Sequence, residues 1–379
     1  MSEPKQIAIA ALEARVFRVP IAHPVRTSFG VMRSRPAVLV RAVDGQGVEG
    51  WGEVWCNFPS VGAEHRARLI RETVAPMLQG RSFTSPGQIW RSLSQALEVL
   101  AIQSGEPGPI AQCLAGIDMA LWDLAARAHG QPLYRYLGAT EAVRRLPVYA
   151  SGLNPDQPEK LAAAKKTEGH RAFKLKIGFG RERDLANLVA LRETFGADAT
   201  LMVDANQAWD IETAVAMSHA IAPFRPTWLE EPLRADAPSQ YWQQLARISP
   251  VPLAAGENMR GEQFEAAVGA GWVKVLQPDV GKWGGFSGCV DVGRSALAAG
   301  VRLCPHWLGG GIGLIASFHL LAAVGGDGLV EVDANPNPLR ELMAAPFPAL
   351  AAGQMDVPQG PGLGVAPDLA ALRAFEAAV

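Results

Sequence analysis

The sequence predicts an α/β protein built around a closed barrel of eight parallel strands, with a smaller α+β domain in front of it. From residue 146 onward, short apolar strands alternate with amphipathic helices, a pattern typical of βαβ units. Eight such strands fit a closed barrel better than an open sheet. Before residue 140 the pattern differs, because three strands are followed by three helices.

The composition is that of a large globular protein. The chain has 379 residues, of which 49% are hydrophobic and 19% charged, so we expect a sizeable core rather than disorder. A net charge of −2 without any basic run argues against nucleic-acid binding. The four cysteines are widely spaced and form no CxxC pair, which favours free thiols in a reducing compartment.

The sequence contains no signal for export or for a membrane. Residues 1–6 lack the charged and then apolar layout of a signal peptide. No apolar run reaches the roughly 20 residues that span a bilayer. We therefore expect a soluble cytoplasmic protein with no membrane partner.

The first domain is expected over residues 1–140. Its strands have the β-branched and apolar content that pleated sheets favour, and its helices carry apolar residues at helical spacing. Polar segments marked by Pro or Gly predict loops at 23–30 and 56–60. The expected strands are 7–19, 37–43 and 51–55, and the expected helices are 62–78, 86–100 and 108–128.

The barrel is expected over residues 141–344. Its strands are predicted at 146–150, 172–177, 199–204, 226–230, 251–256, 272–278, 301–305 and 328–332. Helices fill the gaps at 157–168, 182–195, 210–222, 237–248, 261–270, 286–299 and 310–324. The last helix of an eightfold repeat is missing or altered. Residues 345–379 are rich in Pro and Gly and are expected to wrap back over another part of the molecule.

An ionisable residue closes every barrel strand from the second to the eighth. From Lys176 the successive gaps between these residues are 28, 26, 27, 22, 27 and 25, close to one βα unit each. Because active sites of such barrels lie at the carboxyl ends of the strands, we expect one site there. The strand-end residues are Lys174 and Lys176, Asp204 with Asn206, Glu230 with Glu231, Glu257 with Asn258, Asp279, His306, and Glu331 with Asp333.

Lys174 and Lys176 lie two residues apart in an apolar strand, so both ammonium groups point to the same face. Repulsion between like charges on a buried face is expected to lower the pKa of at least one of them. A lysine with a lowered pKa can act as a base near neutral pH.

Three carboxylates, those of Asp204, Glu230 and Glu257, end consecutive strands. Unpaired, they would repel one another strongly in a desolvated pocket, and a hard divalent cation would resolve the conflict. Carboxylates without a histidine or thiolate among them favour Mg²⁺ or Mn²⁺ over Zn²⁺. The alternative is a network of salt bridges with lysines.

Asp279 and His306 end the sixth and seventh strands, which are neighbours in a barrel. A carboxylate beside an imidazole fixes its tautomer and raises its pKa, so His306 is a candidate acid or base. A substrate carboxylate on the metal would hold its α-carbon between Lys176 and His306. Lys176 can take the α-proton on one face, and His306 can return a proton or protonate a leaving group on the other.

This pattern resembles the enolase superfamily, and in particular its mandelate racemase subgroup, over the whole chain. The resemblance rests on Lys174-Leu175-Lys176, Asp204-Ala205-Asn206, Glu230-Glu231-Pro232, Gly256-Glu257-Asn258, Asp279-Val280-Gly281-Lys282 and His306. It implies a (β/α)7β barrel capped by an α+β domain, which the C-terminal segment completes. It also implies Mg²⁺ on the three strand-end carboxylates.

The resemblance further implies a role for each remaining residue. Lys176 would be the base, and Lys174 would help to hold the substrate carboxylate. Asp279 and His306 match the dyad of the subgroup. Glu331 matches the position that hydrogen-bonds a substrate carboxylate oxygen. Related subgroups that place a lysine at the end of the sixth strand fit less well, since Asp279 stands there.

In this family two mobile cap loops supply specificity, and here they match His23–Val31 and Trp55–Val61. Their side chains contact the substrate or merely pack the loops. The two tryptophans just past the strand ends line the pocket or fill the space between barrel and cap. The candidate substrate contacts are Asn206, Thr27, Phe29, Asn57, Phe58, Trp283 and Trp307.

Two further features are not assigned a direct part in the reaction. Gly309–Gly313 opens a helix and could cradle an anion, but we favour a close approach of the backbone to the cap. Lys282 lies three residues after Asp279 and is interpreted as structural or as a residue that supports the site residues.

The leading functional hypothesis is a Mg²⁺-dependent lyase that dehydrates a sugar acid. Lys176 or His306 would remove the α-proton, and His306 would act as acid for the departing 3-hydroxyl. The enol product would become a 2-keto-3-deoxy acid. This preference comes from the resemblance, since members with this dyad are more often acid-sugar dehydratases.

Two alternatives remain. A racemase or epimerase of a 2-hydroxy acid would use Lys176 and His306 as opposed bases, and loop aromatics would favour it. A binding protein without activity would show a damaged set of site residues, and none is missing here. The expected partner is a small carboxylate substrate, and we also expect a homo-oligomer, from a dimer to an octamer.

Overall fold

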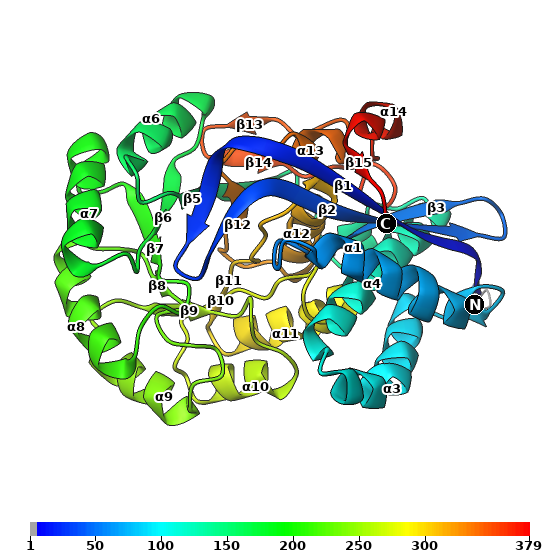
Figure 1. Ribbon diagram of the computed structural model, residues 1–379, viewed down its shortest axis with the longest axis horizontal. Helices are drawn as coiled ribbons and strands as arrows, with labels where there is room; N and C mark the ends of the chain where they lie inside the picture. Colours follow the sequence, from blue (N-terminus) through cyan, green and yellow to red (C-terminus); the bar gives the residue numbers. More distant parts are fainter. Residues whose placement is uncertain (1–5) are drawn as a thin grey trace.

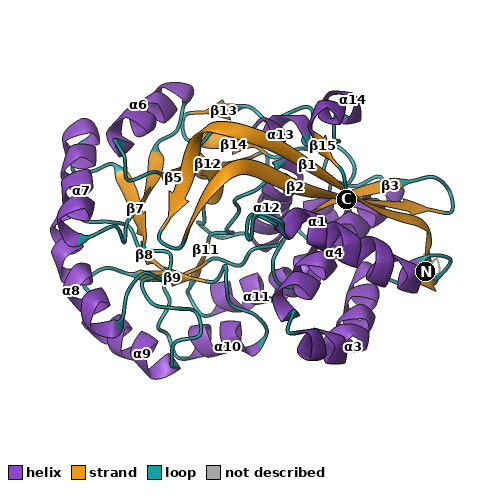
Figure 2. Cartoon of the chain, viewed as in Figure 1, coloured by secondary structure: helices purple, strands orange, loops and turns teal. Residues whose placement is uncertain are grey.

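The computed structural model describes residues 6–379, which form a barrel and a second domain beside it. Helices make an outer ring around the barrel strands, and a long two-stranded ribbon of the second domain extends over the barrel (Figure 1). Figure 2 shows that this ribbon is continuous strand almost to its tip. The expected fold class, a barrel with an N-terminal α+β cap, is confirmed.

The cap is an antiparallel sheet covered by helices. Its central strands are consecutive neighbours, and the C-terminal β15 pairs with β1. The strands are β1 (Ile7–Thr27), β2 (Gly30–Asp44), β3 (Glu49–Val54), β4 (Ser82–Phe83) and β15 (Glu376–Ala377). The helices are α1 (Gly62–Arg68), a π-helical turn (Leu69–Val74), α2 (Ala75–Leu78), α3 (Pro86–Ser104), α4 (Pro107–Ala128) and α5 (Leu133–Tyr136).

The β1–β2 hairpin is longer than the sequence predicts. Residues 23–30 were predicted to be a loop, yet β1 pairs with β2 as far as Thr27 and Gly30. The pairing register shifts between Pro20 and Val25, because β1 has extra residues there, and then resumes. The hairpin tip, between Thr27 and Gly30, therefore reaches the barrel.

Glycines in β3 allow α4 to lie directly against the sheet. A Cβ atom on Gly52 would lie 2.0 Å from the carbonyl oxygen of Gly116, so no side chain fits. The residue that follows, Glu53, is thereby held between sheet and barrel at 1% exposure.

The barrel strands are all parallel, in the order β12-β5-β6-β7-β8-β9-β10-β11. They are β5 (Arg145–Leu153), β6 (Ala172–Lys176), β7 (Thr200–Asp204), β8 (Leu229–Glu230), β9 (Leu253–Ala255), β10 (Val275–Leu276), β11 (Arg302–Leu303) and β12 (Val330–Asp333). The helices between them are α6 (Pro158–Glu168), α7 (Arg181–Phe195), α8 (Ile211–Ile221), α9 (Ser239–Ile248), α10 (Glu262–Gly269), α11 (Gly285–Ala298) and α12 (Gly311–Val324).

After β12 the chain forms short elements in place of an eighth long helix. They are α13 (Pro338–Leu342), the hairpin β13 (Leu350–Ala351) and β14 (Gln354–Asp356), and α14 (Leu369–Leu372). The strand β14 adds antiparallel to the start of β5. The last strand, β15, then returns to the cap.

One hydrophobic core crosses from the cap into the barrel. It includes Phe17 and Trp51 of the cap, Phe318 of α12 and Leu363 of the C-terminal segment. The helix α12 is apolar on all sides and buried from Gly311 to Ala323, as expected for a helix between two packed layers. None of the helices in residues 6–379 is both long and apolar enough to cross a lipid bilayer.

His319 of α12 forms hydrogen bonds through both ring nitrogens, one to α5 and one to the C-terminal segment, at the junction of cap and barrel. Nδ1 accepts the backbone N–H of Tyr134 at 3.1 Å, and Nε2 donates to the carbonyl oxygen of Leu363 at 3.1 Å. The ring is fully buried, and burial lowers the pKa of His319 to about 4. The junction therefore requires the neutral imidazole.

We expect acid to weaken this junction. A folded-state pKa below the ordinary value contributes stability that is complete above about pH 6.5 and is lost as pH falls towards 4, roughly 3 kcal/mol in all. His319→Asn keeps an acceptor for Tyr134 and removes the titration. Its melting temperature should fall less between pH 7 and pH 5 than that of the wild type, and parallel curves would contradict this account.

Candidate active site

The strand ends bring all the predicted acid/base and metal residues to one end of the barrel. Parallel pairing sets Lys176 beside Asp204, and Asp204 beside Glu230. All eight side chains are buried, with exposures between 0% and 8%. They are Lys174, Lys176, Asp204, Glu230, Glu257, Asp279, His306 and Glu331.

Each lysine of the pair faces a carboxylate. Lys174 Nζ lies 2.5 Å from Glu230 Oε1 and 2.8 Å from Glu331 Oε1. Lys176 Nζ lies 2.5 Å from Asp204 Oδ2. Burial alone would lower both pKa values, but the carboxylates outweigh it and raise the pKa of both lysines. The expected lowering is therefore wrong for this arrangement, because attraction to carboxylates exceeds the repulsion between the lysines.

His306 and Asp279 form the expected dyad. His306 Nδ1 lies 2.7 Å from Asp279 Oδ2, and the backbone N–H of Gly281 fixes the other carboxylate oxygen at 2.8 Å. Nε2 then points towards Glu257 Oε2 at 3.3 Å and Glu331 Oε2 at 3.8 Å. Burial would lower the pKa of His306, but these carboxylates raise it to about 9.

Lys282 contacts a predicted metal ligand, in agreement with the second of the two roles considered for it, that of supporting the site residues. Its Nζ lies 2.6 Å from Glu257 Oε2 and 3.1 Å from Asn258 Oδ1. It also lies 4.3 Å from the ring centre of Trp55, at the start of the second cap loop. Burial raises the pKa of Glu257, but His306 and Lys282 outweigh burial and hold it well below its ordinary value.

As the side chains stand, the three predicted metal ligands take part in salt bridges. Asp204, Glu230 and Glu257 each face a lysine, as in the alternative considered from the sequence. Within residues 6–379, no three His, Cys, Asp or Glu side chains are grouped closely enough to hold a metal ion. The geometry alone therefore shows an ion-pair network.

The charges of this network do not balance. Burial raises the pKa of Glu230 to about 7 and that of Glu231 well above its ordinary value, so both carboxyls tend to take up protons. Fully ionised, the cluster has six carboxylates and four cations, a surplus of two negative charges. These groups are Asp204, Glu230, Glu231, Glu257, Asp279 and Glu331, with Lys174, Lys176, Lys282 and His306. Oxygen donors on adjacent strands with this surplus fit one Mg²⁺ ion.

Both cap loops reach the mouth of the barrel. Ser28 Oγ donates to the carbonyl oxygen of Asn206 at 2.7 Å, and Asn57 Nδ2 donates to that of Leu308 at 2.6 Å. The rings of Phe29 and Phe58 meet edge to face at 5.1 Å, which joins the two loops.

The predicted substrate contacts in these loops differ in accessibility. Phe29 is 61% exposed, and Asn57 is 5% exposed. Thr27 is 9% exposed, and its hydroxyl donates to the carbonyl oxygen of Gly30 at 3.1 Å, which closes the hairpin turn. Asn206 holds Asp204 through its backbone N–H at 2.8 Å and its side-chain amide at 3.1 Å. Contact of these residues with substrate stays a prediction.

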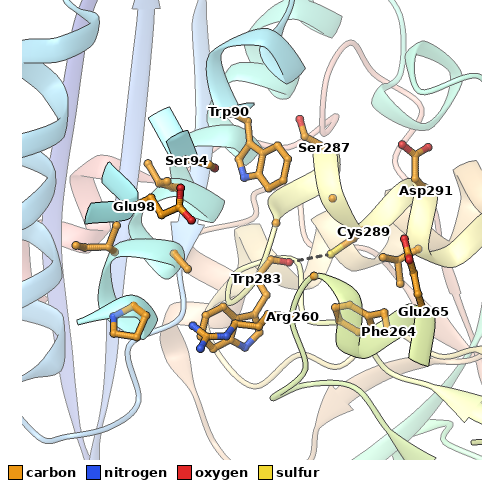
Figure 3. Close-up of a pocket in the computed structure, with 18 of the residues that line it drawn as sticks. Trp90, Ser94, Glu98, Arg260, Phe264, Glu265, Trp283, Ser287, Cys289 and Asp291 are labelled. Carbon is orange, nitrogen blue, oxygen red and sulfur yellow. Dashed lines mark hydrogen bonds between the residues drawn. The ribbon is translucent and has the colours of Figure 1, made fainter. Parts of the chain in front are cut away.

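The two tryptophans just past the strand ends have different surroundings, and the backbone N–H of Trp307 donates to Glu331 Oε2 at 3.1 Å. Trp307 is 2% exposed, and its Nε1 donates to the carbonyl oxygen of Gly310 at 2.8 Å, so it fills space between barrel and cap. Trp283 lines a separate cavity of about 1090 Å³ between α3, α4, α10 and α11. Figure 3 shows Trp283 and Arg260 facing Trp90 and Glu98 across it. Contact of either tryptophan with substrate stays a prediction.

The glycine-rich segment after His306 approaches the cap closely, as favoured from the sequence, because a Cβ atom on Gly310 would lie 2.7 Å from Glu53 Oε1, and the same segment also holds the Glu53 carboxyl group. Glu53 accepts the backbone N–H groups of Gly310 at 2.5 Å and Gly313 at 3.0 Å, at the start of α12. Burial raises the pKa of Glu53 to about 7, against the opposing effect of these hydrogen bonds. The sequence signal for this role is weak, because Glu53 is one of two acidic residues in β3 and only its apolar neighbours Trp51 and Val54 suggest burial.

Comparison with protein families gives matches to both domains. Residues 11–138 match the mandelate racemase/muconate lactonizing enzyme N-terminal domain, and residues 158–371 match the enolase C-terminal domain-like family.

Several characterised proteins are similar to the chain. D-galactarolactone cycloisomerase of Agrobacterium fabrum is 33% identical over 90% of this chain and 91% of its own length. D-galactonate dehydratase of Klebsiella pneumoniae is 33% identical over 73% and 72%. N-succinylamino acid racemase of Thermus thermophilus is 30% identical over 94% and 94%.

Solved structures agree with these matches. A mandelate racemase/muconate lactonizing enzyme from Bordetella bronchiseptica RB50 is 52% identical, with a TM-score of 0.92 over 98% of this chain and 100% of that chain. A racemase from Streptomyces coelicolor A3(2) with bound magnesium is 27% identical, with a TM-score of 0.87 over 97% and 100%. The chain therefore belongs to the mandelate racemase/muconate lactonizing enzyme family of the enolase superfamily.

Proposed function

We propose that this enzyme removes the proton α to the carboxylate of an acid sugar and expels an oxygen substituent from the β-carbon. Loss of a hydroxyl would be dehydration to a 2-keto-3-deoxy acid, and loss of a ring oxygen would be cycloisomerisation. Relatives named for dehydration of D-galactonate and for cycloisomerisation of D-galactarolactone support this substrate class.

The observation that carries the proposal is the Asp279–His306 dyad. With the pKa of His306 raised to about 9, its imidazole is protonated at neutral pH. Asp279 holds Nδ1, so Nε2 is the nitrogen that can give its proton to a departing oxygen. A protonated imidazole can act as this acid, and the preference for elimination over racemisation comes from the relatives named for dehydration and cycloisomerisation, because Glu257, a proposed Mg²⁺ ligand, is the main group that raises the pKa of His306.

The other residues divide the remaining tasks. Lys174 is placed to hold one oxygen of the substrate carboxylate, and Glu331, which contacts Lys174 at 2.8 Å, can hydrogen-bond the other oxygen only as its protonated acid. Lys176 takes the α-proton. The resulting enol then loses its β-oxygen as His306 donates a proton, and the product enol tautomerises to the 2-keto acid.

Asp204, Glu230 and Glu257 would hold Mg²⁺, and Mn²⁺ prefers the same oxygen donors. When bound, the ion would stabilise the negative charge that develops on the substrate carboxylate and relieve the carboxylate charge that raises the pKa of Lys176.

Racemisation of a less polar 2-substituted acid is the second candidate. The aromatic pair of Phe29 and Phe58 at the mouth of the site favours it, as does similarity to an N-succinylamino acid racemase. It would need His306 to act as a base in one direction.

A substrate screen separates the two reactions. With acid sugars, their lactones and 2-substituted acids in D₂O with Mg²⁺, we expect a 2-keto acid, detected by semicarbazide absorbance, from at least one acid sugar or lactone. Deuterium at the α-carbon without any keto acid would contradict elimination and support the racemase.

Replacing His306 should separate proton removal from elimination. His306→Asn removes the acid, so we expect keto-acid formation to fall by about 10²–10⁴-fold while Lys176 still exchanges the α-proton with solvent, measured by NMR in D₂O. Lys176→Ala should abolish both signals. His219→Asn, on the exposed side of α8, is the matched control and should change neither.

Protons should compete with the metal ion. Because the pKa of Glu230 is raised to about 7, its protonated fraction grows as pH falls below 7, and the ion must displace that proton. The Kd for Mg²⁺ should rise by about tenfold from pH 8 to pH 6. Calorimetry in buffers of different ionisation enthalpy should detect the released proton, and a pH-independent Kd would contradict this.

A further inference from the structure

Glu230 is held from beneath the site by two neutral side chains. Its Oε2 accepts the indole N–H of Trp228 at 3.1 Å and the amide N–H of Gln277 at 2.6 Å. Trp228 is 0% exposed and Gln277 is 1% exposed. Trp228 precedes Glu230 by two residues, so both side chains point into the barrel, while Gln277 follows β10.

These two donors differ from the lysines around them. A lysine neutralises the carboxylate it faces, whereas an indole and an amide orient a carboxylate and leave its negative charge in place. With Oε2 held by Trp228 and Gln277, the other oxygen, Oε1, is directed to Lys174 and the reaction side of the barrel. Two neutral donors therefore fix Oε2 of Glu230, while Oε1 faces Lys174 on the reaction side of the barrel.

The Trp228 ring below the Glu230 carboxylate packs against a second aromatic ring. Trp228 meets the ring of Tyr149 edge to face at 5.6 Å, and the same Tyr149 ring lies 5.4 Å from Lys174 Nζ. The carboxylate and its lysine thus rest on one pair of rings, which limits their movement relative to each other.

Packing alone does not account for an amide at position 277. Gln277 uses only its N–H group, and its Oε1 is buried without a hydrogen-bond partner. A leucine or methionine would fill the same space without burying an unpaired acceptor. The amide is explained if its N–H serves Glu230.

We propose that Trp228 and Gln277 are positioning residues, which orient Glu230 so that it presents one oxygen to a divalent cation. This rests on the proposed function, in which Glu230 is a ligand of Mg²⁺. It extends that function from the ligands to the residues that hold one of them.

The test is the affinity of the full-length chain for Mg²⁺ alone, measured by calorimetry. Trp228→Phe and Gln277→Leu each remove one donor, and we expect each to raise the Kd by about 10–100-fold. Trp242→Phe is the matched control, because it also removes a buried indole N–H bond, to the carbonyl oxygen of Arg234 at 3.3 Å, but on α9 outside the barrel. Its Kd should stay within about twofold of the wild type.

A merely structural role would move the melting temperature and leave the Kd unchanged. A Kd equal to that of Trp242→Phe in both site variants would overturn the positioning role while the proposed function stands. A wild-type chain that binds no Mg²⁺ would overturn both. Circular dichroism checks the fold of each variant, and Gln277→Leu, with the smaller change in shape, carries the test if Trp228→Phe does not fold.

Discussion

Six carboxylates and four cationic groups are desolvated together at the carboxyl ends of the barrel strands, and the rest of the site depends on how these charges are compensated. An isolated charge buried here would destabilise the fold by several kcal/mol. Each lysine therefore faces a carboxylate, and His306 lies among three of them. The remaining negative surplus can be met by protons on Glu230 and Glu231 or by a divalent cation, so metal binding and protonation are two solutions to one electrostatic problem.

The cap takes part in this arrangement directly. Glu53 occupies the N-terminal N–H groups of α12, in the segment that follows His306, and Trp55 covers Lys282. The hairpin tip contacts the residue that orients Asp204, through Ser28 and Asn206. The cap therefore contacts the residues that position the charged groups directly. Its placement over the barrel and the positions of these groups depend on each other through these contacts.

The sequence predicts the strand-end residues well because parallel strands place their carboxyl ends together, whatever the helices between them contain. It predicts side-chain partners poorly. The sign of the lysine pKa shifts depends on which charge lies nearest in space, and Lys176 faces Asp204 as well as Lys174. Residues just past the strand ends are the hardest, because the path of each loop decides their direction. Lys282 turns into the site, whereas its neighbour Trp283 turns away into a separate cavity.

The supporting residues illustrate a further limit. Trp228 and Gln277 lie inside or beside barrel strands. From the sequence, a tryptophan there is interpreted as a core residue, and a lone glutamine belongs to no recognisable motif. Only their common approach to one oxygen of Glu230 reveals a shared task. The relatives of this enzyme include proteins named as dehydratases, cycloisomerases and racemases. In the proposed function the barrel removes a proton α to a carboxylate, so the outcome would turn on what lies near His306 Nε2. An oxygen held there departs as it is protonated, and a carbon held there is reprotonated instead. Under the proposed function, the cap hairpin, whose tip contacts Asn206 at the mouth of the barrel, would be the element that selects between these reactions.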